Sequence, residues 1–103
     1  MDGWPETVPV EQIPLIEAIG WDALMMVNEG QFNIERDDAD QVIGIRFDLA
    51  LGWWVVVVGT ADGYSVGRFR AMVPFEWVHG LALGELTYQV QRAAGEASLK
   101  DPD

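Results

Sequence analysis

The sequence predicts an α+β fold, in which an antiparallel four-stranded β-meander carries an N-terminal and a C-terminal helix on one face. The first observation is size and composition, because 103 residues, half of them hydrophobic, suit a single small domain, residues 1–103. The second is a middle region where short apolar runs alternate with turn residues. The third is the helical spacing of apolar residues near both ends. The polar termini, residues 1–8 and 100–103, are expected to fray.

The first helix is predicted over residues 11–27, where apolar residues recur three and four positions apart. Pro14 fits only near a helix start, and Gly20 could divide the segment into two short helices. The alternative is a strand over residues 23–27. The sequence leaves this choice open.

The second helix is predicted from an apolar stripe that runs from Leu83 to Ala97. Charged and amide side chains lie opposite this stripe, as in a helix that covers a core. The FEWVHG stretch before it, residues 75–80, is predicted to form a turn or an extra helical turn.

Two dipeptides set the expected strand pairing. Asp62-Gly63 is the strongest hairpin signal, because a type I′ turn needs positive φ at both central positions. Leu51-Gly52 is predicted to be a second two-residue loop. Earlier strands are expected over residues 31–35 and from Val42 onward, joined by the polar stretch RDDADQ.

Side chains alternate across a strand, so these turns assign every residue to a face. One predicted face is wholly apolar and must lie under the helices. It consists of Phe32, Ile34, Ile43, Ile45, Phe47, Leu49, Trp54, Val56, Val58, Phe69, Ala71 and Val73.

The opposite face supplies the candidate partner-binding surface, because tryptophan, arginine and methionine are typical of interface hot spots. Its residues are Arg46, Asp48, Trp53, Val55, Val57, Arg68, Arg70 and Met72. The alternative is internal cover of this face by the N-terminal arm with Trp4 or by the PFEW segment. The arginines could pair with the chain's own acids, most directly Arg46 with Asp48, or with a second copy.

Charge is the strongest compositional signal. Seventeen acidic and six basic residues give a net charge of −11, which argues against direct binding to nucleic acid or an anionic membrane and permits a basic protein partner. The candidate acidic surface consists of Glu29, Glu35, Asp37, Asp38 and Asp40. It is either a solubilising surface or an imitation of a phosphate backbone, as in a viral, phage-type inhibitor of a host nucleic-acid-binding defence protein.

No pattern of a catalytic or metal site is present in the sequence. There is no cysteine, and neither Ser65 nor Ser98 has an expected histidine partner. His79 stands in a single E-x-x-H motif, and the Asp37–Asp40 cluster lacks the glycine and closing glutamate of a calcium loop. We therefore expect no enzyme activity, no metal and no cofactor. Without a signal peptide or membrane-length apolar run, the expected location is the cytoplasm.

The predicted function is therefore that of a non-catalytic acidic protein-binding module, an inhibitor or adaptor. The alternative is a small homodimeric structural, assembly or chaperone-like protein that self-associates through the face with Trp53, Arg68 and Arg70. The helix–meander–helix order resembles secretion-chaperone-like folds, which bind proteins through a sheet face or dimerise.

Overall fold

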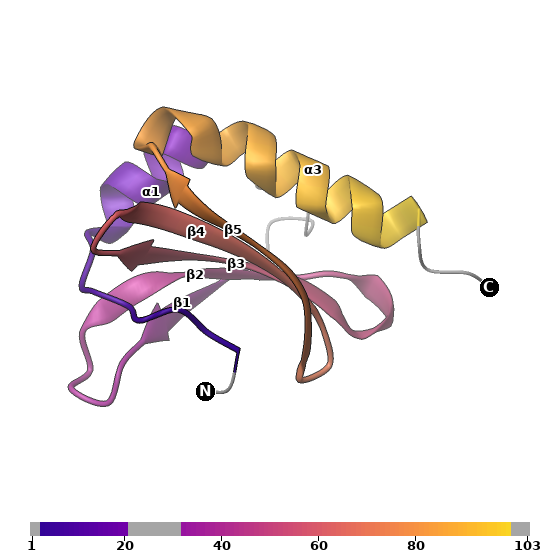
Figure 1. The fold of residues 1–103 in the computed structure, drawn as a ribbon, viewed down its shortest axis with the longest axis horizontal. Coiled ribbons are helices and arrows are strands. Elements are labelled where there is room, and N and C mark those ends of the chain that lie inside the picture. The colour runs from indigo at the N-terminus through magenta and orange to yellow at the C-terminus, as the bar shows by residue number, and fades with distance from the viewer. Residues whose placement is uncertain (1–2, 21–31, 100–103) are drawn as a thin grey trace.

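The computed structural model describes residues 3–20 and 32–99, which form one antiparallel five-stranded sheet with two helices against one face (Figure 1). The strands are β1 (Asn33–Arg36), β2 (Val42–Asp48), β3 (Trp53–Thr60), β4 (Gly63–Arg70) and β5 (Val73–Leu81). The helices are α1 (Gln12–Ile19) and α3 (Leu86–Leu99), and two short 3-10 turns are η1 (Ala50–Gly52) and η2 (Leu83–Glu85). Each strand pairs with the next along the chain, so the predicted α+β meander is confirmed with a fifth strand.

Helix α1 is shorter than its predicted segment. Pro14 is its third residue, where a missing N–H breaks no helical hydrogen bond. The helix ends at Ile19 because Gly20 takes a positive φ of 83° and donates its N–H to the carbonyl of Ile16 at 2.8 Å. The remainder of the predicted segment, residues 21–27, lies outside the described residues. The predicted second helix is confirmed as η2 followed by α3.

Strand β5 contains the FEWVHG stretch, so the predicted turn there is wrong. Val66 of β4 pairs with Val78, and Arg68 pairs with Glu76. The register shifts twice along this pair of strands, which interrupts the regular alternation of apolar and polar residues. Because of these irregularities and Pro74, the sequence of β5 lacks the alternation that predicts a strand.

The β2–β3 loop has three residues, Ala50 to Gly52, where two were predicted. Leu49 donates its N–H to the carbonyl of Trp53 at 2.8 Å and closes this loop. Leu51 and Gly52 both have positive φ, 63° and 82°. The one extra residue pairs Phe47 rather than Asp48 with Val55. Because side chains alternate with a period of two, this turns β2 over relative to β3.

The β3–β4 hairpin differs from its prediction by two residues rather than one. Its loop is Ala61-Asp62, neither of which has positive φ, so the predicted type I′ turn at Asp62-Gly63 is wrong. Val55 pairs with Arg68 instead of Arg70. A two-residue change preserves the faces, so β3 and β4 keep the relative orientation predicted for them.

The helices cover the face that was expected to be open. A buried core joins α1, α3 and the sheet through Leu15, Ile16, Ile19, Ile45, Phe47, Val55, Val57, Val66, Leu81, Leu86, Val90 and Ala93. Trp54 and Phe69 belong to a separate core on the other side of the sheet, with Val56 and Val58. The predicted orientation of β3 and β4 toward the helices is therefore wrong. With β2 turned over, its apolar side chains lie on the same side as Val55 and Val57, and the helices cover that side.

An N-terminal strap, residues 3–10, covers that other side. Val8 donates its N–H to the carbonyl of Gly59, and Val10 donates to that of Val42. The ring of Trp4 lies 6.2 Å from Trp54 between ring centroids and 5.7 Å from Trp77. Trp4 and Val8, which belong to the segment expected to fray, form these contacts. The alternative of cover by the Trp4 arm is realised, but over Trp54 rather than Trp53.

Substitution of Gly67 by alanine tests this strap-side core. A Cβ atom at Gly67 would lie 2.8 Å from the ring of Trp77, which contacts Trp4 and Phe69. We expect Gly67→Ala to lower the free energy of unfolding by about 1–3 kcal/mol, since overpacking a filled core forces side chains to shift. Urea unfolding followed by tryptophan fluorescence measures this change.

The matched control is Gly95→Ala, because a Cβ atom at this exposed position of α3 meets nothing within 4 Å. This variant should gain about 0.5–1 kcal/mol from the loss of glycine's backbone freedom in a helix. A Gly67→Ala protein as stable as the wild type would contradict the packing of Trp77 described here.

Candidate functional site

The predicted partner-binding residues do not share one surface. Val55 and Val57 are fully buried beneath the helices, and Trp53 is almost fully buried. Arg46 and Asp48 pair with Val56 and Trp54 and therefore lie on the opposite side of the sheet. The prediction that these side chains form a single open face is wrong, because the three-residue β2–β3 loop separates them.

The arginines of this predicted surface contact carboxylates and tryptophan rings of the same chain. Arg46 lies 3.1 Å from the carboxylate of Asp48 and 5.4 Å from the ring centroid of Trp54. Pairing of Arg46 with Asp48 within one strand is therefore confirmed. The guanidinium groups of Arg68 and Arg70 both lie 5.5 Å from the ring centroid of Trp53. Arg68 is buried, whereas Arg70 is exposed.

Part of the predicted surface survives at one end of the sheet. Met72 is exposed there together with three apolar side chains that were not among the predicted partner-binding residues. We name these four the apolar end: Leu51, Met72, Val73 and Phe75, which are 67%, 73%, 58% and 56% exposed. Exposed apolar residues are ordinary when scattered, but a group of four at one end of a sheet is typical of an interaction surface.

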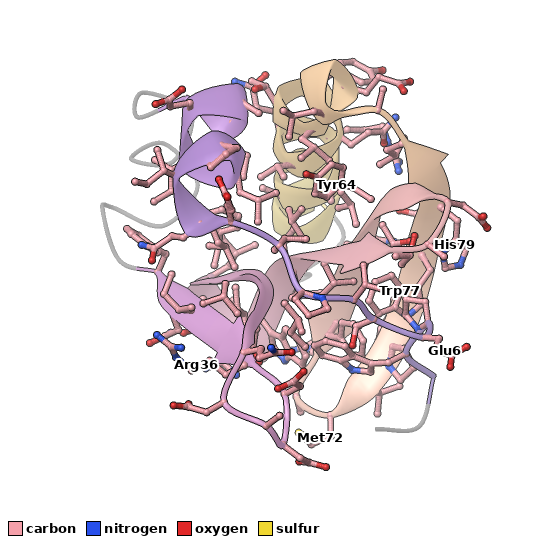
Figure 2. The ribbon with its side chains drawn as sticks, turned by 90° about the vertical axis from the view of Figure 1, so that its left-hand side faces the viewer. Glu6, Arg36, Tyr64, Met72, Trp77 and His79 are labelled. Atoms are coloured by element: carbon pink, nitrogen blue, oxygen red, sulfur yellow. The ribbon has the colours of Figure 1, made fainter. Side chains whose placement is uncertain are left out.

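The apolar end is built by two turns that are hydrogen-bonded to each other. Ala71, in the β4–β5 turn, donates its N–H to the carbonyl of Gly52 in the β2–β3 loop at 2.8 Å. The indole N–H of Trp54 donates to the carbonyl of Ala71. Phe75 packs on Trp53 with 4.9 Å between ring centroids. The exposed side chains therefore stand on a fixed backbone, and Figure 2 shows Met72 near the lower edge of the molecule.

The candidate acidic residues serve partly to build the β1–β2 loop. Asp37 accepts the N–H groups of Ala39 and Gln41 with one carboxylate oxygen, each at 2.9 Å. Asp40 has a positive φ of 63° and lies 3.9 Å from the side chain of Arg36. This is an ordinary side-chain-capped turn.

The remaining acidic residues differ in their contacts. Glu35 lies 3.7 Å from Arg46, and Asp38 is exposed. Asp38 makes no hydrogen bond or ion pair within the described residues. Glu29, the last of the predicted acidic surface, lies outside the part of the chain that the structure describes.

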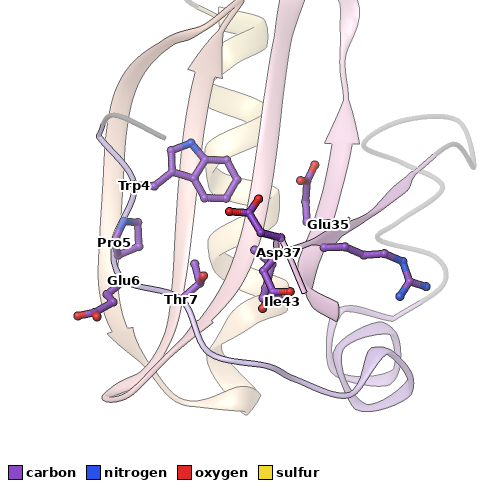
Figure 3. Close-up of a pocket in the computed structure, with 9 residues that line it drawn as sticks. Trp4, Pro5, Glu6, Thr7, Glu35, Asp37 and Ile43 are labelled. Carbon is purple, nitrogen blue, oxygen red and sulfur yellow. The ribbon is translucent and has the colours of Figure 1, made fainter. Parts of the chain in front are cut away.

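A hollow of about 510 Å³ opens between the strap and the β1–β2 hairpin (Figure 3). It is lined by Trp4, Pro5, Glu6, Thr7, Glu35, Arg36, Asp37, Asp38 and Ile43. The sequence pattern marked three of these acids, and it offered the Trp4 arm only as an alternative cover for the Trp53 face, because nothing local in MDGWPETVP predicts which distant strand Trp4 packs on.

His79 and Ser65 are hydrogen-bonded, contrary to the expectation that Ser65 has no histidine partner. The Ser65 hydroxyl lies 2.9 Å from Nδ1 of His79, because β5 pairs with β4 and places His79 on the same side of the sheet. Ser65 is fully buried, so its hydroxyl has no space beside it for a substrate. The pair is a satisfied structural contact.

Within residues 3–20 and 32–99, no three histidine, aspartate or glutamate side chains come together as metal ligands. None of the helices in those segments is long and apolar enough to span a membrane. The chain matches no protein-family model, no curated protein and no solved structure.

Replacement of Asp37 tests whether the acidic loop is structural. Asp37→Ala removes the acceptor for two backbone N–H groups and should lower the free energy of unfolding by about 1–2 kcal/mol. Asp37→Asn keeps an oxygen acceptor and should lose less than half as much. Both are measured by urea unfolding.

Asp38→Ala is the matched control on the neighbouring carboxylate, and we expect it to stay within about 0.5 kcal/mol of the wild type. Equal losses at Asp37 and Asp38 would show that charge, rather than the hydrogen bonds of the loop, sets the effect.

Proposed function

We propose that this protein is a non-catalytic, acidic protein-binding module, an inhibitor or adaptor, whose contact surface is the apolar end. The observation that carries the proposal is the exposure of four apolar side chains at one end of the sheet, two in hydrogen-bonded turns and two at the start of β5. Burial of a side chain such as Phe75 or Met72 by a partner would contribute about 1.5–3 kcal/mol. Four such side chains suffice for the centre of a specific interface.

Composition and rigidity around the apolar end support the same proposal. Arg70 stands beside it, stacked over Trp53, and arginine and tryptophan are enriched among residues that dominate binding energy. Trp53 itself is buried, so it supports Phe75 from beneath and would not touch a partner directly. A surface that is already ordered loses little conformational entropy on binding.

The net charge of −11 favours a partner with a basic surface, since opposite charges raise the rate of encounter. Imitation of a phosphate backbone is not part of this proposal, because Glu35, Asp37 and Asp40 are each engaged within the chain. A chain without cysteine is compatible with a reducing compartment, and we propose that the module acts in the cytoplasm.

The proposal predicts that a double substitution at the apolar end abolishes partner capture. Met72→Asp with Phe75→Ser replaces exposed apolar groups by polar ones, so the fold should remain intact while capture from host lysate falls by at least about tenfold. A photo-crosslinking residue at position 72 should give a discrete crosslinked protein, identified by mass spectrometry.

The matched control is Ile13→Ser with Tyr88→Ser, which changes two apolar side chains of similar exposure on the helices. Capture should survive there, and a crosslinker at position 88 should give no discrete product. Equal loss in both double variants would remove the apolar end as the contact surface.

Sedimentation of the purified chain separates a foreign partner from a second copy. A species of twice the 11.4 kDa mass that disappears in the Met72→Asp, Phe75→Ser variant would make the module a homodimer through the apolar end. Trp53 and Arg68, at the centre of the predicted self-association face, are buried and cannot contact a second copy directly.

A further inference from the structure

We propose that the sulfur of Met72 is an oxidation site through which hydrogen peroxide or another hydroperoxide regulates the apolar end. Conversion of this thioether to a sulfoxide weakens the binding of a partner protein to the surface around it. The inference rests on the proposed function, because the apolar end must contact a partner for its oxidation to alter binding. The oxidation itself depends only on the chemistry and exposure of Met72.

Met72 is the most exposed of the four residues of the apolar end, at 73%. It lies in the turn between β4 and β5, away from both helices (Figure 2). Oxidation of a methionine requires access of the oxidant to its side chain, so an exposed thioether reacts before a buried one. A small hydroperoxide therefore reaches Met72 without any opening of the fold.

The backbone of this turn holds the Met72 side chain in solvent. Ala71, the preceding residue, donates its N–H to the carbonyl of Gly52 and accepts the indole N–H of Trp54 at its own carbonyl. These two hydrogen bonds tie the turn to the neighbouring loop and to β3. Because the backbone is fixed on both sides of Ala71, the next side chain cannot withdraw into either core.

Other oxidisable groups of the described residues are better shielded than Met72. The chain has no cysteine, and Met72 is the single methionine within the part of the chain that the structure describes. Tryptophan is the other readily oxidised residue type, and it is buried at Trp53 and Trp54 and half-buried at Trp4 and Trp77. Among these residues, an oxidant in solution therefore meets Met72 first.

The reaction is a two-electron oxidation of the sulfur. With hydrogen peroxide, a sulfur lone pair attacks one peroxide oxygen, so that an S–O bond forms while the O–O bond breaks. The departing hydroxide takes the proton of the transferred oxygen and leaves as water. The thioether is oxidised to a sulfoxide and the peroxide is reduced, so no further group of the protein is needed.

A sulfoxide at Met72 changes the contact surface without changing the fold. Its oxygen is a strong hydrogen-bond acceptor in place of an apolar thioether. Burial of this oxygen against apolar side chains of a partner carries a desolvation penalty. In the free chain the oxygen remains in water because Met72 is exposed, so both cores keep their packing. Oxidation therefore weakens partner binding and leaves stability unchanged.

Peroxide treatment of the full chain followed by mass spectrometry tests the oxidation site. Trypsin cleaves after Arg70 and Arg92, and the peptide of residues 71–92 contains Met72 as its single methionine. We expect Met72 in the native protein to be oxidised at a rate within about fivefold of that of a methionine in a short unstructured peptide. A slower rate would overturn the proposal.

The effect on binding is measured with a photo-crosslinking residue at position 51, which lies in the apolar end and leaves Met72 in place. Oxidised and untreated chains are freed of peroxide and placed in host lysate that has been gel-filtered to remove small reductants. We expect oxidation to lower the yield of the discrete crosslinked product about tenfold. The urea unfolding midpoint should stay the same. An unchanged yield would contradict regulation through Met72.

Met72→Leu is the matched control, since leucine is apolar, has a similar volume and carries no sulfur. The quantity compared is the ratio of crosslinked yields after and before peroxide, which should stay near one in this variant. Met72→Gln places a polar amide at the same position and should lower the yield without peroxide. A peroxide effect in Met72→Leu as large as in the wild type would assign the loss to other residues and overturn the proposal.

Methionine sulfoxide reductases provide the reverse experiment. Treatment of the oxidised chain with both reductases, one for each sulfoxide epimer, and a thiol reductant should restore the crosslinked yield. A yield that stays low after the sulfoxide has been reduced would show that other damage caused the loss, against the proposal.

Failure of this proposal is distinguishable from failure of the proposed function. Equal capture by the untreated wild type and the Met72→Asp, Phe75→Ser variant would remove the apolar end as a contact surface, whatever the oxidation rate of Met72. Capture that depends on the apolar end but is unaffected by the sulfoxide would overturn the oxidation proposal alone.

Discussion

The structure depends on burying the central strand on both of its faces. Val55 and Val57 are fully buried against the helices, and Val56 and Val58 are fully buried on the strap side. A run of six consecutive apolar residues, Trp53 to Val58, cannot be satisfied by a sheet that leaves one face to water. The fold therefore needs two covers, and the described helices lie on one side of the sheet only. The strap, an extended segment with a single large anchor in Trp4, supplies the second.

This constraint determines where an interaction surface can lie. Both faces of the sheet are buried in the two cores. The arginines that were predicted to border an open surface stack on tryptophans instead. What remains is the periphery: the turns at one end and the space beside the strap. The apolar end and the hollow are thus consequences of covering β3, because each lies at an edge of the region that the helices or the strap cover.

Much of the architecture could be predicted from the sequence, and the side of the sheet could not. The strands around β2, β3 and β4 and the C-terminal helix follow from alternation, turn residues and helical spacing. Facing depends on whether the β2–β3 loop has two residues or three, and leucine at position 51 gives no sign that it adopts positive φ, which is uncommon for such a residue. Periodicity carries no information about absolute facing when both faces of a strand are apolar.

The candidate site was predictable only where composition marked it. Arg70 and Met72 were selected for their residue types and are exposed at the apolar end, and Glu35, Asp37 and Asp38 were selected for charge and line the hollow. Phe75 was hidden by the irregular pairing of β5, and Val73 was wrongly assigned to the buried face although it is exposed. Trp4 acts through contacts with Trp54, Phe69 and Trp77, and no local pattern reports a partner so distant along the chain.

The strap also fixes an order of events during biosynthesis. Trp4 leaves the ribosome before any strand of the sheet exists, yet its ring must wait for Trp77 in the last strand. Hairpins with short loops close quickly, whereas joining positions so far apart requires the intervening chain to be organised first. The strap, which is made before the sheet, is thus among the last parts of the fold to settle, and until it does, the aromatic side of the nascent sheet stays open to water and to chaperones.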